Sequence, residues 1–323
     1  MGQAREGETD LAVRAAWLSY VGGYTQEQIA QRLGVSRVKV HRLSALAQNL
    51  GFVKVSIEHE LASTAALENQ LIEMYGLTNC ILVPAMDDGV GRRGDGTTAA
   101  LGTAGARLLS RYLDREPKAL VGIGWGKTLS AVAEKLLRKP RPNNRFVSVL
   151  GSLTRHAAAN PYDVIHQLAS KTGAEGFIMP VPFIADVVAD RTLLMGQKSV
   201  SKIVALAEQA DLYMLGVGSC GPNASAFMSG QVTSPELDAL KAAGAVGDLL
   251  GRFFDLSGRM VDCEFNDRVL GLDLEALKGR QVTAIAGGPG KLPAITGALR
   301  IGVITTLITD EDTAQGLLEP GPA

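Results

Sequence analysis

Hydrophobic residues recur at helical spacing through the first fifty positions of the chain. They predict a first helix over residues 11–22, which the pair Gly22-Gly23 ends. A second helix is expected from Thr25 to Gly34, because Thr25 and Gln28 fit the capping box that begins many helices. Two helices this short, each followed by glycine, indicate a small helical module at the start of the chain.

A third helix is predicted to begin at Ser36, whose side chain can cap its first turn. Its inward face comprises Val40, Leu43, Ala47 and Leu50. Residues 52–57 then alternate with a period of two, as a strand does. Three helices followed by a short strand predict a winged helix-turn-helix, with residues 1–10 expected to fray.

The outward side of this third helix is basic, which suits the major groove of DNA. We expect Arg37 and Val38 to reach base edges, while Lys39, Arg42 and the wing residue Lys54 hold phosphates. The candidate DNA-binding residues are Ser36, Arg37, Val38, Lys39, His41, Arg42 and Lys54. The alternative is an ordinary three-helix cluster with a solvated basic face.

Charge along the chain favours the DNA-binding interpretation. The whole chain carries 32 Lys and Arg against 33 Asp and Glu, a net charge of −1. Residues 32–54, however, hold five basic residues and no acidic one, which leaves −6 on the other 300 residues. A basic island on an acidic body suggests a nucleic-acid-binding module attached to a second domain.

Beyond this module the chain is expected to form an α/β domain. A helix over 61–75 leads out of the module as a linker or a dimer contact. Strands are then predicted at 80–83, 120–123, 146–150, 178–181, 212–215, 282–286 and 303–308, and helices near 97–113, 128–138, 161–172, 199–209, 235–243 and 291–299. This alternation predicts a Rossmann-like, doubly wound parallel sheet. The expected divisions are a DNA-binding domain at 1–58, a linker helix at 59–76 and an effector-binding domain at 77–323.

Several function classes are disfavoured by what the sequence lacks. No apolar run of about 18 residues and no apolar N-terminal core is present, so we expect a cytoplasmic protein without membrane partners. Three widely spaced cysteines, Cys80, Cys220 and Cys263, fit neither a disulfide framework nor a metal knuckle. No two of the four histidines have metal-ligand spacing, so no metal, cofactor or catalytic residue is predicted.

Three glycine-rich loops follow predicted strands. Residues 120–128 run from a strand through glycines into a helix, a pattern typical of anion binding at a helix N-terminus, although the glycine spacing is not that of a P-loop. Residues 216–221 match GxGxxG, but Pro222 follows and no helix begins there, which disfavours nicotinamide binding. Residues 286–291 would project Lys291 over the carboxyl edge of the sheet. A binding site at that edge is therefore expected; the alternatives are a tight strand-to-helix turn that binds nothing at 120–128 and a solvated side chain at Lys291.

Longer segments resemble the SorC family of bacterial transcriptional regulators. They are GIGWGKTL (122–129), MLGVGS (214–219), AVGDLLGRFFDLSG (245–258) and the block from 284 to 314. The resemblance covers about residues 11–318. It implies a carbohydrate-responsive repressor or activator whose C-terminal domain has the fold of ribose-phosphate isomerases and glucosamine-phosphate deaminases. It also implies a dimer or tetramer on operator DNA.

The same resemblance implies which residues hold the effector. Gly124, Trp125, Gly126 and Thr128 would form the loop for its phosphate or terminal hydroxyl, lined from the neighbouring strand by Gly218 and Ser219. Asp248 would receive sugar hydroxyls, Lys291 would meet the effector, and Asn160 is a weaker match.

Trp125 and Lys127 depart from the pattern of phosphosugar-sensing members, in which Thr or Ser stands beside the loop glycines. An unphosphorylated sugar or polyol is therefore an alternative to a sugar phosphate, since Trp125 can stack on a sugar or narrow the site. The sequence as a whole resembles the erythritol-operon regulators within the family. A sugar-phosphate isomerase or deaminase that has kept its chemistry is the alternative from another class.

Overall fold

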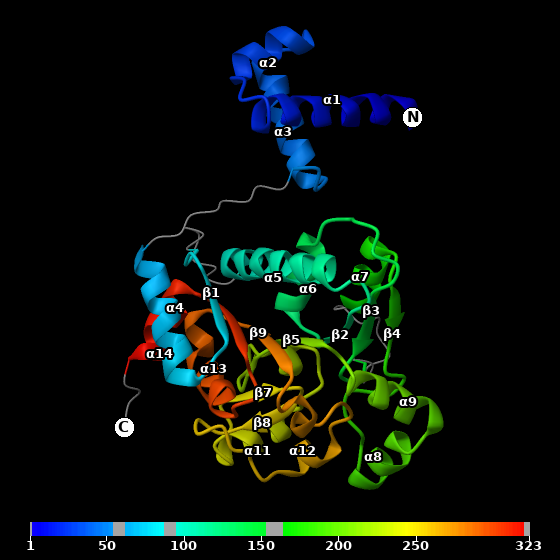
Figure 1. Cartoon of the computed structure of the whole chain (residues 1–323), viewed down its shortest axis with the longest axis vertical. Helices are drawn as coiled ribbons and strands as arrows, with labels where there is room; N and C mark the ends of the chain where they lie inside the picture. Colours follow the sequence, from blue (N-terminus) through cyan, green and yellow to red (C-terminus); the bar gives the residue numbers. More distant parts are fainter. Residues whose placement is uncertain (1, 54–61, 87–94, 153–163, 320–323) are drawn as a thin grey trace. The chain divides into compact units, whose positions relative to one another are not determined.

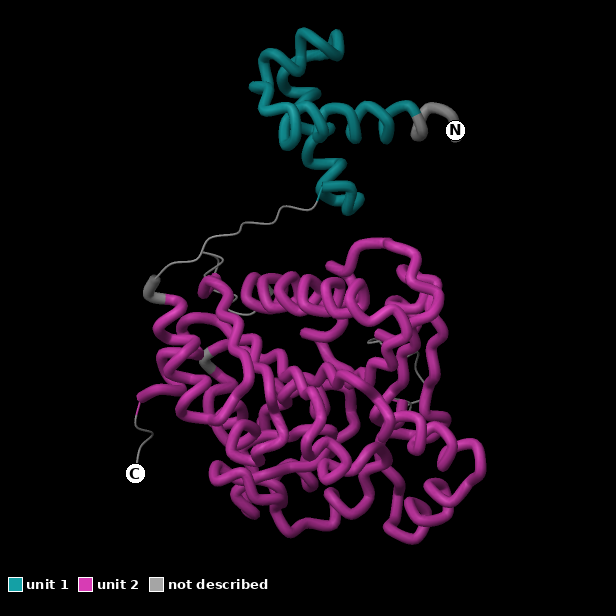
Figure 2. Tube along the Cα trace, in the orientation of Figure 1, with its two compact units in different colours: residues 1–60 teal, residues 61–323 magenta. Residues whose placement is uncertain are grey.

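The computed structural model describes residues 2–53, 62–86, 95–152 and 164–319. The chain divides into two compact units, residues 1–60 and residues 61–323 (Figure 2). Each described hydrophobic cluster draws its residues from a single unit, so each unit has its own core.

The first unit is a helix-turn-helix built from three helices, α1 (Gly2–Tyr20), α2 (Gln26–Leu33) and α3 (Arg37–Asn49) (Figure 1). Helix α1 begins at Gly2, so it includes residues 2–10 of the segment that we expected to fray. Helix α1 packs against α3 through alanines, which lets the two backbones approach closely. The core of the unit comprises Ala12, Ala15, Ala16, Ile29, Ala30, Val40, Leu43 and Ala47.

Local signals in the sequence set the ends of these helices as predicted. The Thr25 side chain accepts the Gln28 N–H while the Gln28 side chain accepts the Thr25 N–H, which completes the capping box. Gly34 ends α2 in the left-handed conformation at φ 65°. Ser36 caps α3 by accepting a hydrogen bond from the Lys39 N–H at 3.3 Å.

Two expectations for the end of this unit are wrong. Leu50 is 48% exposed and does not belong to the inward face, because α3 ends at Asn49 and the chain turns there. Phe52 and Val53 are not in a strand; the Phe52 N–H bonds to the Ala47 carbonyl of α3, and Val53 packs against the core of the unit. The remainder of the predicted wing, including Lys54, lies outside the described residues.

The second unit contains a parallel sheet of seven described strands in the order β1-β10-β9-β5-β2-β3-β4. The strands are β1 (Asn79–Val83), β2 (Leu120–Ile123), β3 (Arg145–Ser148), β4 (Glu175–Phe177), β5 (Leu212–Gly216), β9 (Gln281–Ile285) and β10 (Thr306–Asp310). Every neighbouring pair runs parallel, which confirms the predicted sheet type.

Helices cover both faces of this sheet (Figure 1). They are α4 (Ala62–Tyr75), α5 (Asp95–Arg115), α6 (Lys127–Lys135), α7 (Val164–Thr172), α8 (Val188–Met195), α9 (Lys198–Ala207), α10 (Ser225–Met228), α11 (Ser234–Ala242), α12 (Glu264–Arg268), α13 (Leu292–Arg300) and α14 (Glu311–Leu318), with 3-10 turns at Leu274–Leu277 and Pro289–Lys291. Side chains alternate along β5: Leu212 and Met214 pack with α5, α6 and α7, while Tyr213 and Leu215 join the core with α4, α13 and α14. The fold is thus doubly wound.

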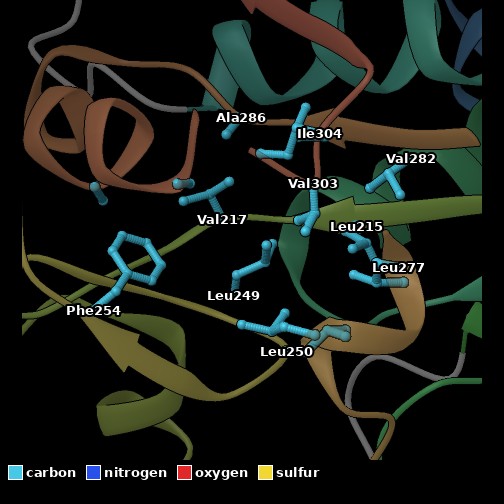
Figure 3. Packing of buried hydrophobic residues seen from close by; sticks show 14 of the residues in the cluster. Leu215, Val217, Leu249, Leu250, Phe254, Leu277, Val282, Ala286, Val303 and Ile304 are labelled. Atoms are coloured by element: carbon cyan, nitrogen blue, oxygen red, sulfur yellow. The ribbon is translucent and has the colours of Figure 1, made fainter. Parts of the chain in front are cut away.

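A second sheet, which the sequence pattern does not predict, packs on the α13 side. Its strands β6 (Gly218–Ser219), β7 (Gly247–Leu249) and β8 (Arg252–Phe254) are antiparallel. Leu249 and Phe254 from these strands lie in one buried cluster with Val217 and Val282, near the large sheet (Figure 3). The small sheet therefore holds β7 against the end of β5.

The strand predicted at 178–181 is wrong, since β4 ends at Phe177. Pro180 and Pro182 alternate with the hydrophobic residues there, and proline has no N–H to donate to a strand ladder. Met179 and Val181 are nevertheless buried, in a small cluster with α9. Alternating hydrophobic residues are therefore buried here without forming a strand.

No helix among the described residues combines the length and apolar character needed to cross a bilayer.

Candidate functional site

The strand order of the large sheet creates a crevice between β2 and β5. After β2 the chain adds β3 and β4 on one side, then returns to place β5 on the other side. In open parallel sheets, ligands bind at such a switch point, outside the carboxyl ends of the strands. The loops after β2 and β5 meet at this point, and they are the first two glycine-rich loops of the sequence.

A cavity of about 630 Å³ occupies this edge of the sheet. Eight of the nine predicted effector residues line it, namely Gly124, Trp125, Gly126, Thr128, Gly218, Ser219, Asp248 and Lys291. Asn160 lies outside the described residues. The sequence therefore located residues that the fold brings together, while their roles toward a ligand remain predictions.

The loop after β2 presents backbone N–H groups to the cavity. Gly126 precedes α6 at φ 122°, a conformation that glycine adopts without a steric cost, and no side chain is recorded as capping this helix. The first N–H groups of a helix are left without intrahelical acceptors, and the helix dipole favours negative charge near them. A phosphate or a sugar hydroxyl can accept hydrogen bonds here, beside the Thr128 side chain.

Asp248 lies opposite Gly218 in the small sheet. A Cβ atom at position 218 would overlap the Asp248 carboxylate, so glycine there makes room for it. One carboxylate oxygen accepts a hydrogen bond from the Gly251 N–H at 3.1 Å. Burial raises the pKa of Asp248 to about 6, against the opposing effects of that N–H and of Lys291. The carboxyl is thus poised to change charge just below neutral pH.

Lys291 supplies the positive charge facing Asp248. Its Nζ donates to the Val217 carbonyl oxygen at 3.0 Å, which places the ammonium at the end of β5. Burial lowers the pKa of Lys291, and the Asp248 charge opposes that effect. A carboxylate and an ammonium in one cavity can accept from and donate to neighbouring hydroxyls of a polyol or sugar.

Trp125 forms part of the cavity wall. Its ring makes an edge-to-face contact with Phe183, with centroids 5.3 Å apart and an interplanar angle of 88°. The residue is half-buried and packs on the main core while also lining the cavity. The tryptophan therefore narrows the site as part of its wall.

Further polar residues line the cavity that were not selected from the sequence. They are Thr97, Thr98, Lys127, Asn223, Ser225, Asp310 and Asp312. Asp310 ends β10, two residues beyond the strand predicted at 303–308, so that prediction did not mark it. Thr97 and Thr98, by contrast, belong to α5, and helical spacing alone does not show that the start of that helix reaches the sheet edge.

Within the described residues, no cluster of three or more His, Cys, Asp or Glu side chains could hold a metal ion. Cys220 lines the cavity as a free thiol, and burial raises its pKa.

The first unit has a separate candidate interface on α3. Its predicted DNA-facing residues are all exposed, namely Ser36, Arg37, Val38, Lys39, His41 and Arg42. Val38 is 72% exposed, so its side chain is accessible for an apolar contact with a base. Arg32, also counted in the basic island, stacks over the Tyr24 ring at 4.1 Å from the centroid. The start of α3 thus presents together the side chains that are predicted to read bases and to hold phosphates.

These two sites define a class: a helix-turn-helix unit joined to a ligand-binding parallel sheet. Residues 59–319 match the protein family described as "Putative sugar-binding domain". The erythritol catabolism regulatory protein EryD of Brucella abortus is 38% identical over 313 residues, covering 97% of this chain and 98% of the relative. The full-length sorbitol operon regulator SorC of Klebsiella pneumoniae has a similar structure, with a TM-score of 0.74 at 27% identity, covering 96% of this chain and 98% of that one.

The transcriptional regulator LsrR of Escherichia coli is also similar, at 30% identity over 317 residues, covering 96% of this chain and 95% of the relative. The chain belongs to the SorC family of sugar-binding transcriptional regulators.

Proposed function

We propose that this protein regulates an operon for polyol or sugar catabolism and that the effector binds in the cavity at the carboxyl edge of the sheet. The observation that carries this proposal is the meeting of the uncapped α6 N-terminus, Asp248 and Lys291 around one cavity. These groups bind hydroxyls and a terminal phosphate or hydroxyl, which are the groups that polyols, sugars and their phosphates share.

An erythritol-like polyol is the first effector to test, because EryD is similar along nearly its whole length. The charged groups also suit a small neutral ligand. Asp248, Asp310 and Asp312 line the cavity together with Lys127 and Lys291, so its acidic and basic groups are nearly balanced. A sugar phosphate would place its phosphate at the α6 N-terminus and Lys127, but the negative charges of the three aspartates would weaken its binding.

We further propose that operator DNA is bound by the exposed side of α3 in a dimer or tetramer, as helix-turn-helix proteins pair their recognition helices on half-sites. The effector controls binding only if it prefers one of two arrangements of the oligomer, since a ligand that binds both equally shifts nothing. Basic contacts to phosphates make this binding strongly dependent on salt.

A second function, sugar-phosphate isomerisation or deamination, is favoured by one observation. A carboxyl with a pKa of about 6 beside a lysine is also suited to general base catalysis near neutral pH. The similar proteins whose names state a role are regulators, and the exposed basic helix has no use in such an enzyme. We therefore propose that the cavity senses its ligand and does not convert it.

The test is a thermal-shift screen of the purified protein with erythritol, sorbitol, ribose and their phosphates, followed by a turnover assay for each compound that binds. Binding without turnover is the expected result. Thr128→Ala and Lys291→Ala should weaken binding and leave operator affinity unchanged. Steady conversion of a sugar phosphate, surviving deletion of residues 1–60, would instead establish the enzyme.

The DNA interface is tested with two variants of α3. Arg37→Ala should lower discrimination between operator and unrelated DNA, by about 1–3 kcal/mol for one base contact. Lys39→Ala should weaken binding to all sequences alike and reduce the salt dependence by about one phosphate contact. If both variants bind as the wild type does, the recognition surface is not the exposed side of α3.

A further inference from the structure

Asp310 lines the cavity, yet its carboxylate is bonded to its own chain. Oδ1 accepts a hydrogen bond from the Thr313 N–H at 3.0 Å, and Oδ2 accepts from the Thr313 hydroxyl at 2.7 Å and the Gly288 N–H at 2.7 Å. The residue is 2% exposed. Three donors leave little capacity to receive a ligand hydroxyl, so Asp310 has another role than Asp248.

These bonds fasten the cavity wall to the start of α14. Gly287, Gly288 and Lys291 belong to the turn after β9 and line the cavity. The Gly288 N–H also lies 2.9 Å from the Thr313 hydroxyl oxygen, and a Cβ at Gly287 would overlap the Asp310 carboxylate. A ligand that shifts or fixes this turn therefore shifts or fixes the first turn of α14.

Helix α14 in turn lies beside α4 and is bonded to it near both ends (Figure 1). The Thr64 hydroxyl donates to the Glu311 carboxylate at 3.4 Å, and Glu311 directly follows Asp310. The Tyr75 hydroxyl donates to the Leu317 carbonyl oxygen at 3.1 Å. Helix α4 is the first described element of the second unit, directly after the chain leaves the DNA-binding unit.

We propose that the Asp310–Thr313 cap and α14 transmit the state of the cavity to α4, the first described helix after the DNA-binding unit. Asp310 and Thr313 are positioning residues in this arrangement. Neither Glu311 nor Thr64 lines the cavity, so transmission can be interrupted without touching the ligand. The inference rests on the proposed function, because it requires an effector that binds this cavity.

The structure allows the link to be cut without removing α4 from the fold. Helix α4 is also bonded to β1, where the Glu68 carboxylate accepts a hydrogen bond from the Leu82 N–H at 2.9 Å. Its Leu71 is fully buried in the main core. A variant that loses only the bonds to α14 therefore keeps two other anchors.

The experiment compares full-length wild type with the double variant Thr64→Val/Tyr75→Phe, which removes both hydroxyls and keeps the side-chain shapes. Erythritol, sorbitol and ribose 5-phosphate are the probes. Calorimetry measures their affinity, and hydrogen exchange measures protection of α14 and α4. Glu73→Gln, at an exposed position of α4, is the matched control.

In the wild type a bound probe should slow amide exchange in both helices, by about five-fold or more if the coupling has the usual size. The double variant should keep its probe affinity within about two-fold and its protection of α14, and lose the protection of α4. Thr313→Val should lose protection in both helices, and Thr313→Ser, which keeps the hydroxyl, should restore it.

Unchanged α4 protection in the double variant would overturn the inference, as would a bound probe that leaves α4 exchange unaltered in the wild type. If none of the probes binds the wild type, the proposed effector class is wrong and the inference falls with it. The two failures are thus distinguished by the binding measurement on the wild type alone.

Discussion

At the scale of single residues, Asp248 is the group with the clearest energetic signature. Its pKa rises from 3.8 to about 6 on folding because the carboxylate is removed from water. Between these two values the folded protein holds a proton that the unfolded chain releases. The free energy of unfolding therefore falls as the pH rises through this window, and the loss is complete above about pH 6.

We predict that Asp248→Asn abolishes this dependence. The stability of the wild type relative to the variant should decrease by about 2–3 kcal/mol between pH 4 and pH 7, from the size of the shift. Urea unfolding at several pH values measures it. Asp262→Asn, an exposed acidic position, is the control. Parallel pH profiles for wild type and Asp248→Asn would show that burial does not hold the Asp248 proton.

Gly218 gives the second prediction at this scale, because its lack of a side chain accommodates Asp248. Gly218→Ala should destabilise the protein by about 1–3 kcal/mol, as overpacking usually does, and should abolish effector binding. Adding Asp248→Ala should restore much of the stability and none of the binding, as urea unfolding and calorimetry would show.

Gly221→Ala is the matched control for Gly218→Ala. Gly221 lines the same cavity, but an added Cβ there would meet nothing within 4 Å. Equal effects at the two positions would mean that crowding of Asp248 is not the cause.

At the scale of elements, the recognition helix depends on its first turn. Ser36→Ala removes the acceptor of the Lys39 N–H and should cost about 1 kcal/mol of local stability. Amide exchange at the start of α3 should become about five-fold faster, and operator affinity should fall with it. Ser44→Ala, within the same helix, should change neither; a similar effect there would implicate helix propensity in place of the cap.

An element could be predicted from the sequence when its buried residues recur at the spacing of a helix or a strand. The strands β2, β5 and β9 could be predicted because they are mostly apolar runs with a glycine at their end or within two residues after it. Strands β6 and β7 have two or three residues, too few to show a period. Helix α8 was missed because none of its residues is fully buried, so its sequence carries no clear apolar stripe.

The candidate site divides in the same way. Glycine loops after strands have local signatures, so Gly124, Gly126 and Gly218 could be located from the sequence. Asp310 could not, because its carboxylate meets the Gly288 N–H, 22 residues away along the chain, only after β9 and β10 have paired. Contacts made by long-range pairing leave no periodic trace in one sequence.

At the scale of the whole molecule, the two units have separate cores, and the basic excess is confined to one segment of the first unit. The described core of the DNA-binding unit lies between Ala12 and Ala47, and that of the second unit begins at Leu71. The basic residues of segment 32–54 belong to the first unit, which carries seven basic against six acidic residues, while residues 61–323 carry 25 basic against 27 acidic residues.

A chain of residues 59–323 should therefore bind the effector with wild-type affinity and should not bind DNA. Calorimetry with the effector and a mobility-shift assay with operator DNA measure the two properties. Binding of DNA by this truncated chain would contradict the assignment of all DNA contacts to the first unit, since an acidic body is expected to repel the phosphate backbone.

The place of β10 in the sheet has a consequence for synthesis of the protein. β10 spans Thr306–Asp310, near the end of the chain, yet it lies between β1 and β9 and is the only strand paired with β1 in the described sheet. During synthesis, β1 is made more than two hundred residues before β10, the strand with which it pairs. A chain truncated before Thr306 would still contain the DNA-binding unit, but β1 would lack the strand that it pairs with. We therefore expect the protein to respond to its effector only after β10 has been synthesised.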